Sequence, residues 1–379
     1  MGKYLFITAN ESSSWAGSEL LWSETAGKLV HRGNEVRVSL KRWGGPTPHV
    51  DRLRSAGCRI FYRRPPSFIS RQARKILPLT EYSLKHMRAI GDSMDLVVIS
   101  QCLNSDGLPW MEAARATRRT YAPIVQAVHD SWWPENDMVE RYAAAYEASR
   151  RAYFVSQGNL DLTRRQFATP LLNAKIVRNP FNVRYDARPH WPAGPSEALC
   201  LACVGRLDPA TKGQDLLLEV LGLPHWRQRD VRVSLFGEGH NEVLLRRRAE
   251  QLKLTTVKFL GYEVDIEKIW SVHHALVLPS RQEGMPLVIV EAMLCGRPCI
   301  VTDVAGHKEL VHDGMNGFLA RAPTVELLDD AMNRAWENRS RLQAMGVQAA
   351  RDVRQWVSAD PAEEFARELE SLVSGGEPK

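Results

Sequence analysis

The sequence contains no apolar run long enough to cross a bilayer, no internal repeat and no low-complexity tract. A membrane-spanning helix needs about 18 or more consecutive apolar residues, and no stretch of the chain approaches that length. The first apolar run, "YLFITA", is short and is soon followed by Glu11, so it does not have the pattern of a secretory signal. We therefore expect a cytoplasmic protein, and contact with the inner face of the membrane is left open.

The sequence is also poor in metal-binding patterns. It has six cysteines, and two of them, Cys200 and Cys203, lie in "ALCLACVG", which is typical of a buried strand. Residues three apart on a strand point to opposite faces, so we do not expect these two thiols to share a zinc ion. No two aspartates lie two residues apart, which excludes a D-x-D metal site. We expect buried free thiols in a reducing compartment and no metal cofactor.

The chain has ordinary globular composition, with 44% hydrophobic and 25% charged residues. Its 379 residues exceed the size at which one hydrophobic core stops growing, about 250–300 residues, so two domains are expected. Charge is unevenly distributed. Residues 1–190 hold 28 Lys+Arg against 17 Asp+Glu, whereas residues 191–379 hold 22 against 27.

The positive charge is densest in residues 59–88, which contain eight Lys and Arg and one Glu among aromatic and aliphatic residues. Such a segment could lie on anionic lipid or accept an acidic substrate. A solvated helix face beside a loop explains the same pattern equally well.

Apolar runs with strand character alternate with stretches of helical spacing along both halves of the chain. This alternation predicts an α/β protein with two Rossmann-like, doubly wound parallel-sheet domains facing each other across a cleft. A proline-rich stretch at 182–196 interrupts it and is predicted to link the domains. We assign residues 1–182 to an N-terminal domain, completed by a C-terminal helix at 358–374, and residues 196–357 to a C-terminal domain. The predicted strands lie at 3–9, 35–40, 95–100, 123–129, 151–156, 174–179, 198–205, 230–237, 256–261, 274–280, 297–303 and 316–320.

Ligands bind open parallel sheets at the loops that follow the strands, so these loops are the places to search. After the strand at 198–205 comes "GRLDPATKGQDLL", with Arg206 directly beyond the strand and Lys212 beside Gly213, where a helix should begin. Two cations next to a helix N-terminus suit an anion such as a phosphate. By itself, this pair of residues fits a solvated loop as well.

The stretch "SRQEGMPLVIVEAMLCGRP" places Glu283 before a helix start and Glu291 one turn inside that helix. Pro286 suits the first helical position, and the free amides near Leu287 and Val288 would attract a second anion. Carboxylates repel phosphates but accept hydrogen bonds from paired sugar hydroxyls. A ligand built of sugar, diphosphate and ribose satisfies both requirements, with phosphates on the cations and amides and a glutamate on the hydroxyls at each end.

The stretch "EGMPLVIVEAMLCGRPCIVTDVAGHKELVHDGMNGFL" resembles the signature region of the retaining, family 4 glycosyltransferases of GT-B architecture, including their E-x7-E motif. The resemblance extends, in order, over most of the chain. The further segments that carry it are "WAGSE", "LVHRGNEVRV", "AVHD", "VRNPFNV", "VGRLDPATKG" and "LFGEGH". The ordered set is specific, whereas each short motif alone is not.

The resemblance implies roles for the second half of the chain. Arg206 and Lys212 would neutralise the donor diphosphate and act in catalysis. Glu283 would hold donor-sugar hydroxyls and also belongs to the catalytic set, and Glu291 would take the ribose hydroxyls. Tyr262 would lie beside the base, for which ordinary packing is an equal alternative. The turn that would cradle sugar and phosphate is formed by Gly284, Met285, Pro286 and Leu287.

In the first half, the resemblance implies that Gly17 lets a loop approach the phosphates and that His129 faces the reacting sugar as a catalytic residue. Trp132 and Trp133 follow His129, and either sugar stacking or packing suits them. The sequence departs from the family pattern at Ala16, where the family usually has Gly, at Asn34, where His is frequent, and at "HHA" (273–275), where an acidic residue often precedes the Ala.

The family therefore implies a retaining, metal-independent transfer of a sugar from a nucleotide diphosphate sugar, with UDP-sugars favoured, to a hydroxyl of a glycan, a lipid-linked acceptor or a small molecule. Surface polysaccharide, lipopolysaccharide or glycoconjugate synthesis is the expected setting, without nucleic acid as a partner. The alternatives are a nucleotide-sugar epimerase of the same fold and a catalytically silent nucleotide-sugar-binding protein. An NAD-dependent oxidoreductase is disfavoured because "GEGHNEV" lacks the last glycine of G-x-G-x-x-G.

Overall fold

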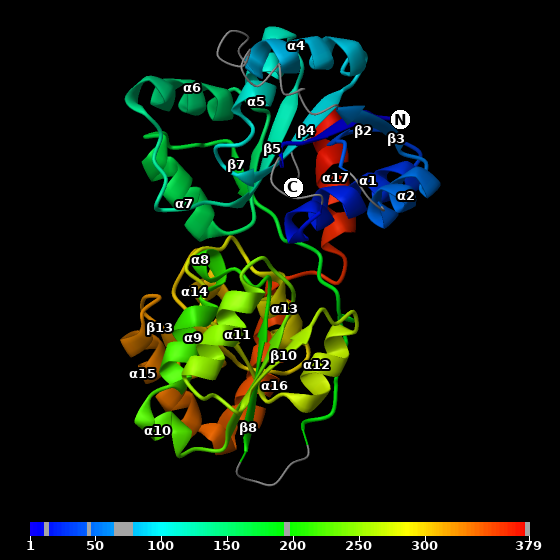
Figure 1. Cartoon of the computed structure of the whole chain (residues 1–379). Helices are drawn as coiled ribbons and strands as arrows, with labels where there is room; N and C mark the ends of the chain where they lie inside the picture. The colour runs from blue at the N-terminus through cyan, green and yellow to red at the C-terminus, as the bar shows by residue number, and fades with distance from the viewer. Residues whose placement is uncertain (11–14, 44–46, 64–78, 193–197, 376–379) are drawn as a thin grey trace. The chain divides into compact units, whose positions relative to one another are not determined.

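The computed structural model describes residues 1–10, 15–43, 47–63, 79–192 and 198–375 (Figure 1). The chain divides into two compact units. Unit 1 comprises Met1–Pro180 together with Asp360–Lys379, and unit 2 comprises Phe181–Ala359.

Unit 1 is built on a parallel sheet in which the described residues form seven strands in the order β3-β2-β1-β4-β5-β6-β7. The strands of its centre are fully buried, which is why their sequences are continuous apolar runs. The strands are β1 (Lys3–Thr8), β2 (Glu35–Lys41), β3 (Arg59–Arg63), β4 (Leu96–Leu103), β5 (Tyr121–Ala127), β6 (Ala152–Phe154) and β7 (Ala174–Ile176).

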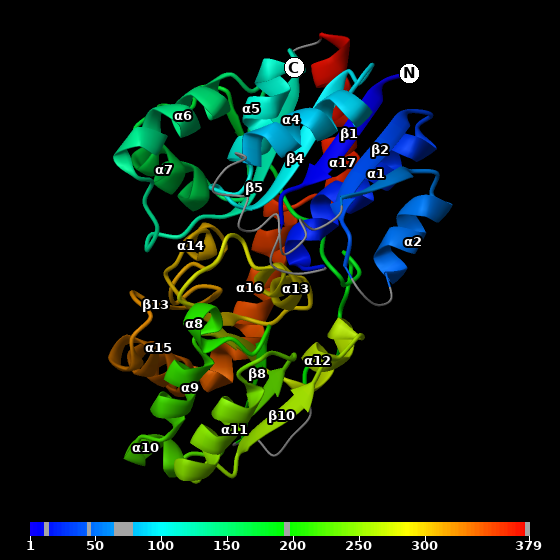
Figure 2. The same cartoon turned by 45° about the horizontal axis from the view of Figure 1, so that its top comes forward.

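Helices cover both faces of this sheet (Figures 1 and 2). One face packs against α1 (Leu20–His31), α2 (Pro48–Ser55) and the C-terminal helix α17 (Pro361–Ser374). The other packs against α4 (Leu79–Ile90), α5 (Leu108–Ala116), α6 (Asn136–Glu147) and α7 (Gln157–Gln166). A short 3-10 turn, η1 (Gly17–Glu19), leads into α1.

The C-terminal helix α17 is part of unit 1 because it is held to α1 by packing and by charge. Asp360 caps its first turn by accepting from the Glu363 amide at 3.0 Å. Arg32, the C-cap of α1, pairs with Glu370 at 2.8 Å, and Glu368 accepts from the Tyr153 hydroxyl of β6 at 3.0 Å. The last helix of the chain therefore completes the layer that begins with the first.

Unit 2 has a parallel sheet in which the described residues form six strands in the order β10-β9-β8-β11-β12-β13. The strands are β8 (Leu199–Val204), β9 (Val231–Phe236), β10 (Val257–Gly261), β11 (Ala275–Leu278), β12 (Cys299–Thr302) and β13 (Gly317–Ala320). The helices are α8 (Pro209–Lys212), α9 (Gln214–Leu221), α10 (Pro224–Arg227), α11 (Glu242–Gln251), α12 (Ile266–Val272), α13 (Leu287–Leu294), α14 (His307–Leu310), α15 (Val325–Glu337) and α16 (Leu342–Trp356), with a 3-10 turn, η2 (Arg339–Arg341), before α16.

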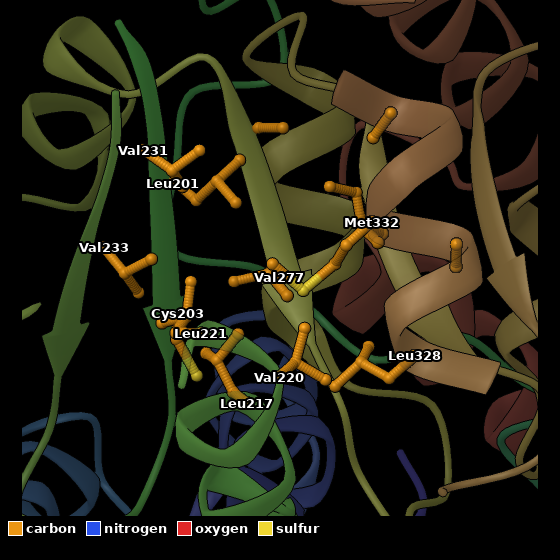
Figure 3. Packing of buried hydrophobic residues seen from close by; sticks show 14 of the residues in the cluster. Leu201, Cys203, Leu217, Val220, Leu221, Val231, Val233, Val277, Leu328 and Met332 are labelled. Carbon is orange, nitrogen blue, oxygen red and sulfur yellow. The ribbon is translucent and has the colours of Figure 1, made fainter. Parts of the chain in front are cut away.

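The core of unit 2 lies between its sheet and the helices α9 and α15 (Figure 3). Alternate residues of each strand contribute, as expected for side chains that point to opposite faces. Figure 3 labels Leu201, Cys203, Val231, Val233 and Val277 from the strands and Leu217, Val220, Leu221, Leu328 and Met332 from the helices. Cys203 is therefore a packing residue, and all six cysteines are free thiols.

Residues 181–192 have no helix or strand, but they are hydrogen-bonded to unit 2. Arg184 forms a fork with Glu267 of α12, with 3.0 Å between Nη2 and Oε2. Arg354 of α16 donates to the Tyr185 carbonyl at 3.0 Å. This part of the predicted linker is thus bound along one unit, while residues 193–197 lie outside the described residues.

Twelve of the strands follow the apolar runs of the sequence, but β3 was not among the predicted strands. The alternative of a solvated helix face is wrong for 59–63, because "RIFYR" pairs in parallel with β2 at the sheet edge. Because arginines stand at both ends of this strand, its sequence does not show the apolar run by which the other strands were predicted. The remainder of the basic segment includes residues 64–78, which lie outside the described residues.

Candidate functional site

The candidate site of unit 2 lies at the carboxyl ends of β8 and β11, the two neighbouring strands at which the winding of the sheet reverses direction. In doubly wound sheets this reversal point leaves a crevice in which ligands bind. Arg206 and Lys212 follow β8, and Glu283 follows β11. Side chains more than 70 residues apart in the sequence therefore meet at one edge of the sheet.

Close backbone contacts hold the two loops together. Gly213 has a left-handed conformation, with φ of 66°, and a Cβ there would lie 2.0 Å from the Pro279 carbonyl oxygen. Only glycine allows that approach. The amides of Arg281 and Gln282 both donate to the Thr211 carbonyl, at 2.8 and 3.1 Å. The position of Lys212 relative to Glu283 is therefore fixed by backbone as well as by side chains.

Lys212 and Glu283 form an ion pair, with 2.5 Å between Nζ and Oε1. The Ser280 hydroxyl donates to the same carboxylate oxygen at 2.7 Å. The Glu283 side chain is only 7% exposed and that of Lys212 is 22% exposed, so the pair is shielded from water. A buried charge pair with a third hydrogen-bond partner is well oriented, and it can exchange its internal contact for a ligand carrying both phosphate and hydroxyl groups.

A third loop, after β12, supports the Glu283 loop from behind. The Thr302 hydroxyl donates to the Ser280 carbonyl at 2.6 Å, and the Gly306 amide donates to the Gly284 carbonyl at 3.2 Å. His307 is fully buried, and its Nδ1 bonds the Thr302 carbonyl at 2.7 Å. Burial lowers the pKa of His307, and nearby Glu283 opposes that shift. Sequence reasoning gave this histidine no role, although it stands inside the signature stretch as "AGHKEL".

The turn from Gly284 to Pro286 leads into α13. Pro286 is the N-cap of this helix, with an extended backbone, rather than its first helical residue. The amides of Leu287 and Val288 belong to the first turn of the helix and have no carbonyl partner within it, so they are available to a ligand, and the helix dipole favours an anion there. Met285 beside them is buried.

Glu291 is 4% exposed and lies one turn inside α13. Its Oε1 accepts from the backbone amide of Asn182 at 3.0 Å and from the Asn182 side chain at 2.8 Å. Burial raises the pKa of this carboxyl, and the two Asn182 bonds partly offset the rise. Among the described residues no hydrogen bond ends on Oε2, which can still accept from a ligand hydroxyl. Asn182 had not been singled out from the sequence, because no local pattern links it to a residue 109 positions away.

Arg206 and Tyr262 are the more open members of the predicted set. The Arg206 side chain is 54% exposed and donates to Asp208 at 3.0 Å. Burial would raise the pKa of Asp208, but the Thr211 hydroxyl and Arg206 outweigh it and lower the pKa. Tyr262 follows β10 and is 72% exposed, so packing does not explain it.

The two predicted site residues of the first half, Gly17 and His129, belong to unit 1. Each follows a strand: Gly17 begins η1 after β1, and His129 lies two residues beyond β5. The His129 carbonyl accepts from Gln166 at 2.8 Å, which fixes the backbone of its loop. Trp132 and Trp133, which follow His129, differ in their surroundings. Trp132 packs edge-on against Tyr142 and Phe167, whereas Trp133 is 56% exposed.

Unit 1 also contains a small pocket, of about 50 Å³, at the carboxyl ends of β1 and β2. Trp15 lies stacked on His49 in its wall, with ring centroids 4.5 Å apart. Glu19 lines it as well, is 4% exposed and accepts from the Trp22 indole at 2.7 Å. Burial raises the pKa of the Glu19 carboxyl, and hydrogen bonds from Trp22 and Asn10 oppose it. The pocket combines flat aromatic faces with a carboxylate, which is the combination that sugars bind.

Arg63, the last residue of β3, belongs to the basic segment 59–88 but is buried inside unit 1. It is 3% exposed and donates to the carbonyls of Ser39 and Thr8. Its guanidinium lies over the Trp110 ring, 5.0 Å from the centroid. In the described residues, no helix is long and apolar enough to span a bilayer.

Comparison with known proteins adds to this geometry. Residues 198–338 match the family model described as "Glycosyl transferases group 1". The matched residues belong to unit 2. All predicted site residues from Arg206 to Glu291 fall within the matched stretch, and Gly17 and His129 lie outside it.

Two curated relatives illustrate the range of the similarity. The chain is 33% identical over 111 residues to "Putative glycosyltransferase EpsD" of Bacillus subtilis, a match that covers 29% of each protein. It is 25% identical over 95% of its length to a Mycobacterium tuberculosis protein named GDP-mannose-dependent alpha-(1-6)-phosphatidylinositol monomannoside mannosyltransferase, of which 94% is covered. The chain spans about a third or less of the length of the first curated relatives that it matches.

Solved structures match over the whole chain. The Anabaena protein HepE in complex with UDP superposes with a TM-score of 0.73 at 20% identity, covering 97% of this chain and 99% of that one. A glycosyltransferase from Rickettsia africae gives a TM-score of 0.77 at 15% identity, with both chains fully covered. At these identities the likeness shows the fold. The predicted fold class, two Rossmann-like domains of the GT-B kind, is confirmed.

Proposed function

We propose that this chain is a retaining, metal-independent glycosyltransferase that moves a sugar from a nucleotide diphosphate sugar to a hydroxyl acceptor. The observation that carries the proposal is the Lys212–Glu283 pair beside the N-terminus of α13. A cation, a carboxylate and free helix amides within one crevice match a ligand in which phosphate and sugar are adjacent.

The diphosphate is the part of the donor that gains charge when the glycosidic bond breaks. Lys212 and Arg206 supply two positive charges, and the first amides of α13 supply hydrogen bonds without moving. Preorganised charges in a site that excludes water commonly supply several kcal/mol of barrier reduction. We therefore propose that protein groups, rather than a metal ion, stabilise the leaving group, and that chelators leave the activity unchanged.

Glu283 and Glu291 are assigned to the uncharged parts of the donor. When a phosphate binds Lys212, the Glu283 carboxylate loses its internal partner and becomes free to accept sugar hydroxyls, still held by Ser280. Glu291 keeps Oε1 on Asn182 and offers Oε2 to a ribose hydroxyl. The ribose contact does not select a base, because all common nucleotides carry the same pair of ribose hydroxyls. We favour a UDP-sugar because several structures of this fold were determined with UDP.

Retention of anomeric configuration is proposed from the resemblance to family 4 enzymes. In that scheme the acceptor attacks from the side on which the diphosphate departs, and a phosphate oxygen takes the acceptor proton. His129 is proposed to face the reacting sugar, and Gly17 to allow its loop to approach the phosphates. Nothing in these roles needs a second carboxylate as nucleophile.

The acceptor is proposed to bind unit 1, in the pocket lined by Trp15, Glu19 and His49. Aromatic rings cover the apolar face of a sugar, and a carboxylate accepts from its hydroxyls. A glycan or lipid-linked glycan is therefore favoured over a small charged metabolite. A polysaccharide or glycoconjugate pathway at the inner face of the membrane is the proposed setting. A related protein named as a galactosyltransferase of a diphosphoundecaprenol-linked sugar supports it.

Contact with anionic lipid through residues 59–88 is part of this proposal. Among its described residues, Arg59 and Arg88 are exposed. Flotation on anionic vesicles should weaken with salt and with the double change Arg59→Gln/Arg88→Gln. Equal flotation on neutral vesicles would contradict the contact.

The proposal is tested first by thermal shift against a panel of nucleotide sugars. A donor that binds only the folded state raises the melting temperature by mass action. The best donor is then assayed for release of nucleoside diphosphate with and without glycan acceptors, which separates a transferase from an epimerase or a silent binder. The variant Glu283→Gln should abolish acceptor-dependent release while the protein stays folded. Full release by that variant would refute the site.

A further inference from the structure

Unit 2 has a second concave site that the proposed donor chemistry does not use. It is an open concavity of about 460 Å³ between residues 187–191, the turn after α13 and the side of α16. Four arginines line it, Arg188, Arg297, Arg351 and Arg354, and among the described residues no aspartate or glutamate does. None of the residues assigned to the donor lines this arginine pocket.

Arg297 is a buried cation that has no carboxylate partner within the described part of the chain. It is 2% exposed, and each of its hydrogen bonds ends on a backbone carbonyl, among them Trp270 at 2.8 Å, Cys295 at 2.8 Å and His190 at 2.6 Å. Its guanidinium lies over the Trp191 ring, 4.9 Å from the centroid. Burial lowers the pKa of Arg297 to about 10, which is the expected response of a charge that lacks a counterion.

Arg354 is bound in the same way. It donates to the carbonyls of Tyr185 at 3.0 Å, Ala350 at 2.8 Å and Leu294 at 3.0 Å. Leu294 is the last residue of α13, so part of this positive charge is offset by the helix dipole. The carbonyls satisfy the donors, but they supply no full negative charge.

Arg188 and Arg351 complete the pocket from the solvent side. Both are exposed, and within the described ranges neither makes a hydrogen bond or an ion pair. Residues 181–359 hold 22 Lys and Arg against 22 Asp and Glu, so the unit as a whole is neutral. Four positive charges in one concavity of a neutral unit are therefore a local concentration rather than a general surplus.

We propose that the arginine pocket binds a polyvalent phosphate group. The two exposed guanidinium groups would each offer a planar fork of donors, and phosphate presents oxygens at matching spacing. The buried guanidinium group of Arg297 and the half-buried one of Arg354 would add attraction, because charges shielded from water interact more strongly than charges in water. The ligand would bridge the segment entering unit 2 and helix α16. A soluble diphosphate and the headgroup of a lipid share this chemistry.

The test uses inorganic pyrophosphate as the probe, with binding measured by calorimetry on the full chain. All measurements are made in an Arg206→Ala/Lys212→Ala background, so that the proposed donor site contributes nothing and the two proposals can fail separately. Adding Arg188→Gln/Arg351→Gln should weaken pyrophosphate binding about tenfold or more, because two charge-assisted contacts are lost. The matched control is Arg247→Gln/Arg321→Gln, which removes two other exposed arginines of unit 2 and should change affinity less than twofold.

A second arm identifies the source of the phosphate. The same proteins are sedimented with vesicles of phosphatidylcholine alone or with added phosphatidylglycerol. Pyrophosphate binding that depends on Arg188 and Arg351 supports a soluble ligand, and vesicle binding with the same dependence supports a lipid headgroup. Binding that is absent in both arms, or that falls equally in the pocket pair and the control pair, would overturn the proposal.

Discussion

The two units share one winding and differ in the loops that follow their strands. Unit 1 orders its first five strands β3-β2-β1-β4-β5, and unit 2 repeats the pattern as β10-β9-β8-β11-β12. In unit 2 the loops at the reversal point carry a lysine, an arginine and a glutamate held together by backbone contacts. In unit 1 the pocket at the carboxyl ends of the neighbouring strands β1 and β2 carries aromatic rings and a buried glutamate. The fold positions a site, and the loop residues decide its chemistry.

The largest effect is expected from Lys212→Ala. This change removes a cation from the proposed diphosphate and leaves Glu283 with Ser280 as its remaining partner. We expect turnover to fall about 100-fold or more, the effect of losing one preorganised group at a developing charge. The measurement is kcat/KM for nucleoside diphosphate release. Lys258→Ala, an exposed lysine of β10, is the matched control and should retain wild-type rates. Equal rates in both variants would contradict the assignment of the donor diphosphate to Lys212 of unit 2.

Glu291→Gln separates binding from stability. The buried carboxyl has a raised pKa, so it takes up a proton on folding, and its contribution to stability is lost as pH rises from the unfolded value through the raised folded value. A neutral amide avoids this loss and still accepts from Asn182. We expect donor affinity to fall about tenfold, the effect of one hydrogen bond to a charged group, while the melting temperature at pH 7 stays equal or rises. A variant that unfolds would assign Glu291 to structure alone.

Trp15→Ala sharpens the role of unit 1. Loss of a stacked ring should raise the acceptor KM about tenfold, corresponding to roughly 1–1.5 kcal/mol of aromatic contact, and leave donor affinity unchanged. Initial rates at varied acceptor concentration, with the donor saturating, provide the measurement. Trp226→Ala is not a suitable control because that ring is in the core of unit 2. Leu172→Ala, which removes an exposed apolar side chain of unit 1, is preferred. If Trp15→Ala changed donor affinity and left the acceptor KM unchanged, the Trp15 ring would be assigned to the donor site, and the proposed acceptor site would be wrong.

The smallest effect concerns pH and unit 1. Burial lowers the pKa of His86 to about 4, with Arg63 adding to the shift, and its Nε2 bonds the Ser39 hydroxyl at 2.8 Å. Because the folded pKa lies below the ordinary value of 6.5, the contribution of His86 is full above pH 6.5 and is lost as pH falls toward 4. His86→Gln should reduce the loss of melting temperature between pH 7 and pH 5 by an amount on the order of a few degrees. An unchanged pH profile would show that His86 does not titrate in this range.

Much of the fold was predictable because most strands are buried on both faces. A strand such as "ALVL" in β11 is apolar throughout, so its type is visible without knowledge of its neighbours. The edge strand β3 was missed because Arg59 and Arg63 give it a surface-like sequence. Arg63 is nevertheless buried, since three hydrogen-bond acceptors and a tryptophan ring surround it. Burial of a charged residue depends on partners that are distant in sequence.

The sequence by itself determined the two doubly wound units and the stretch that carries Glu283, Pro286 and Glu291, because periodicity, helix starts and short-range motifs are local properties. Only the tertiary structure decided which groups meet. The Lys212–Glu283 pair joins residues 71 positions apart, and Glu291 reaches Asn182 across 109. The arginine pocket likewise draws on residues 187–191, 294–297 and 343–354. Such contacts arise from the order of strands in a sheet, which brings loop ends together regardless of their separation along the chain.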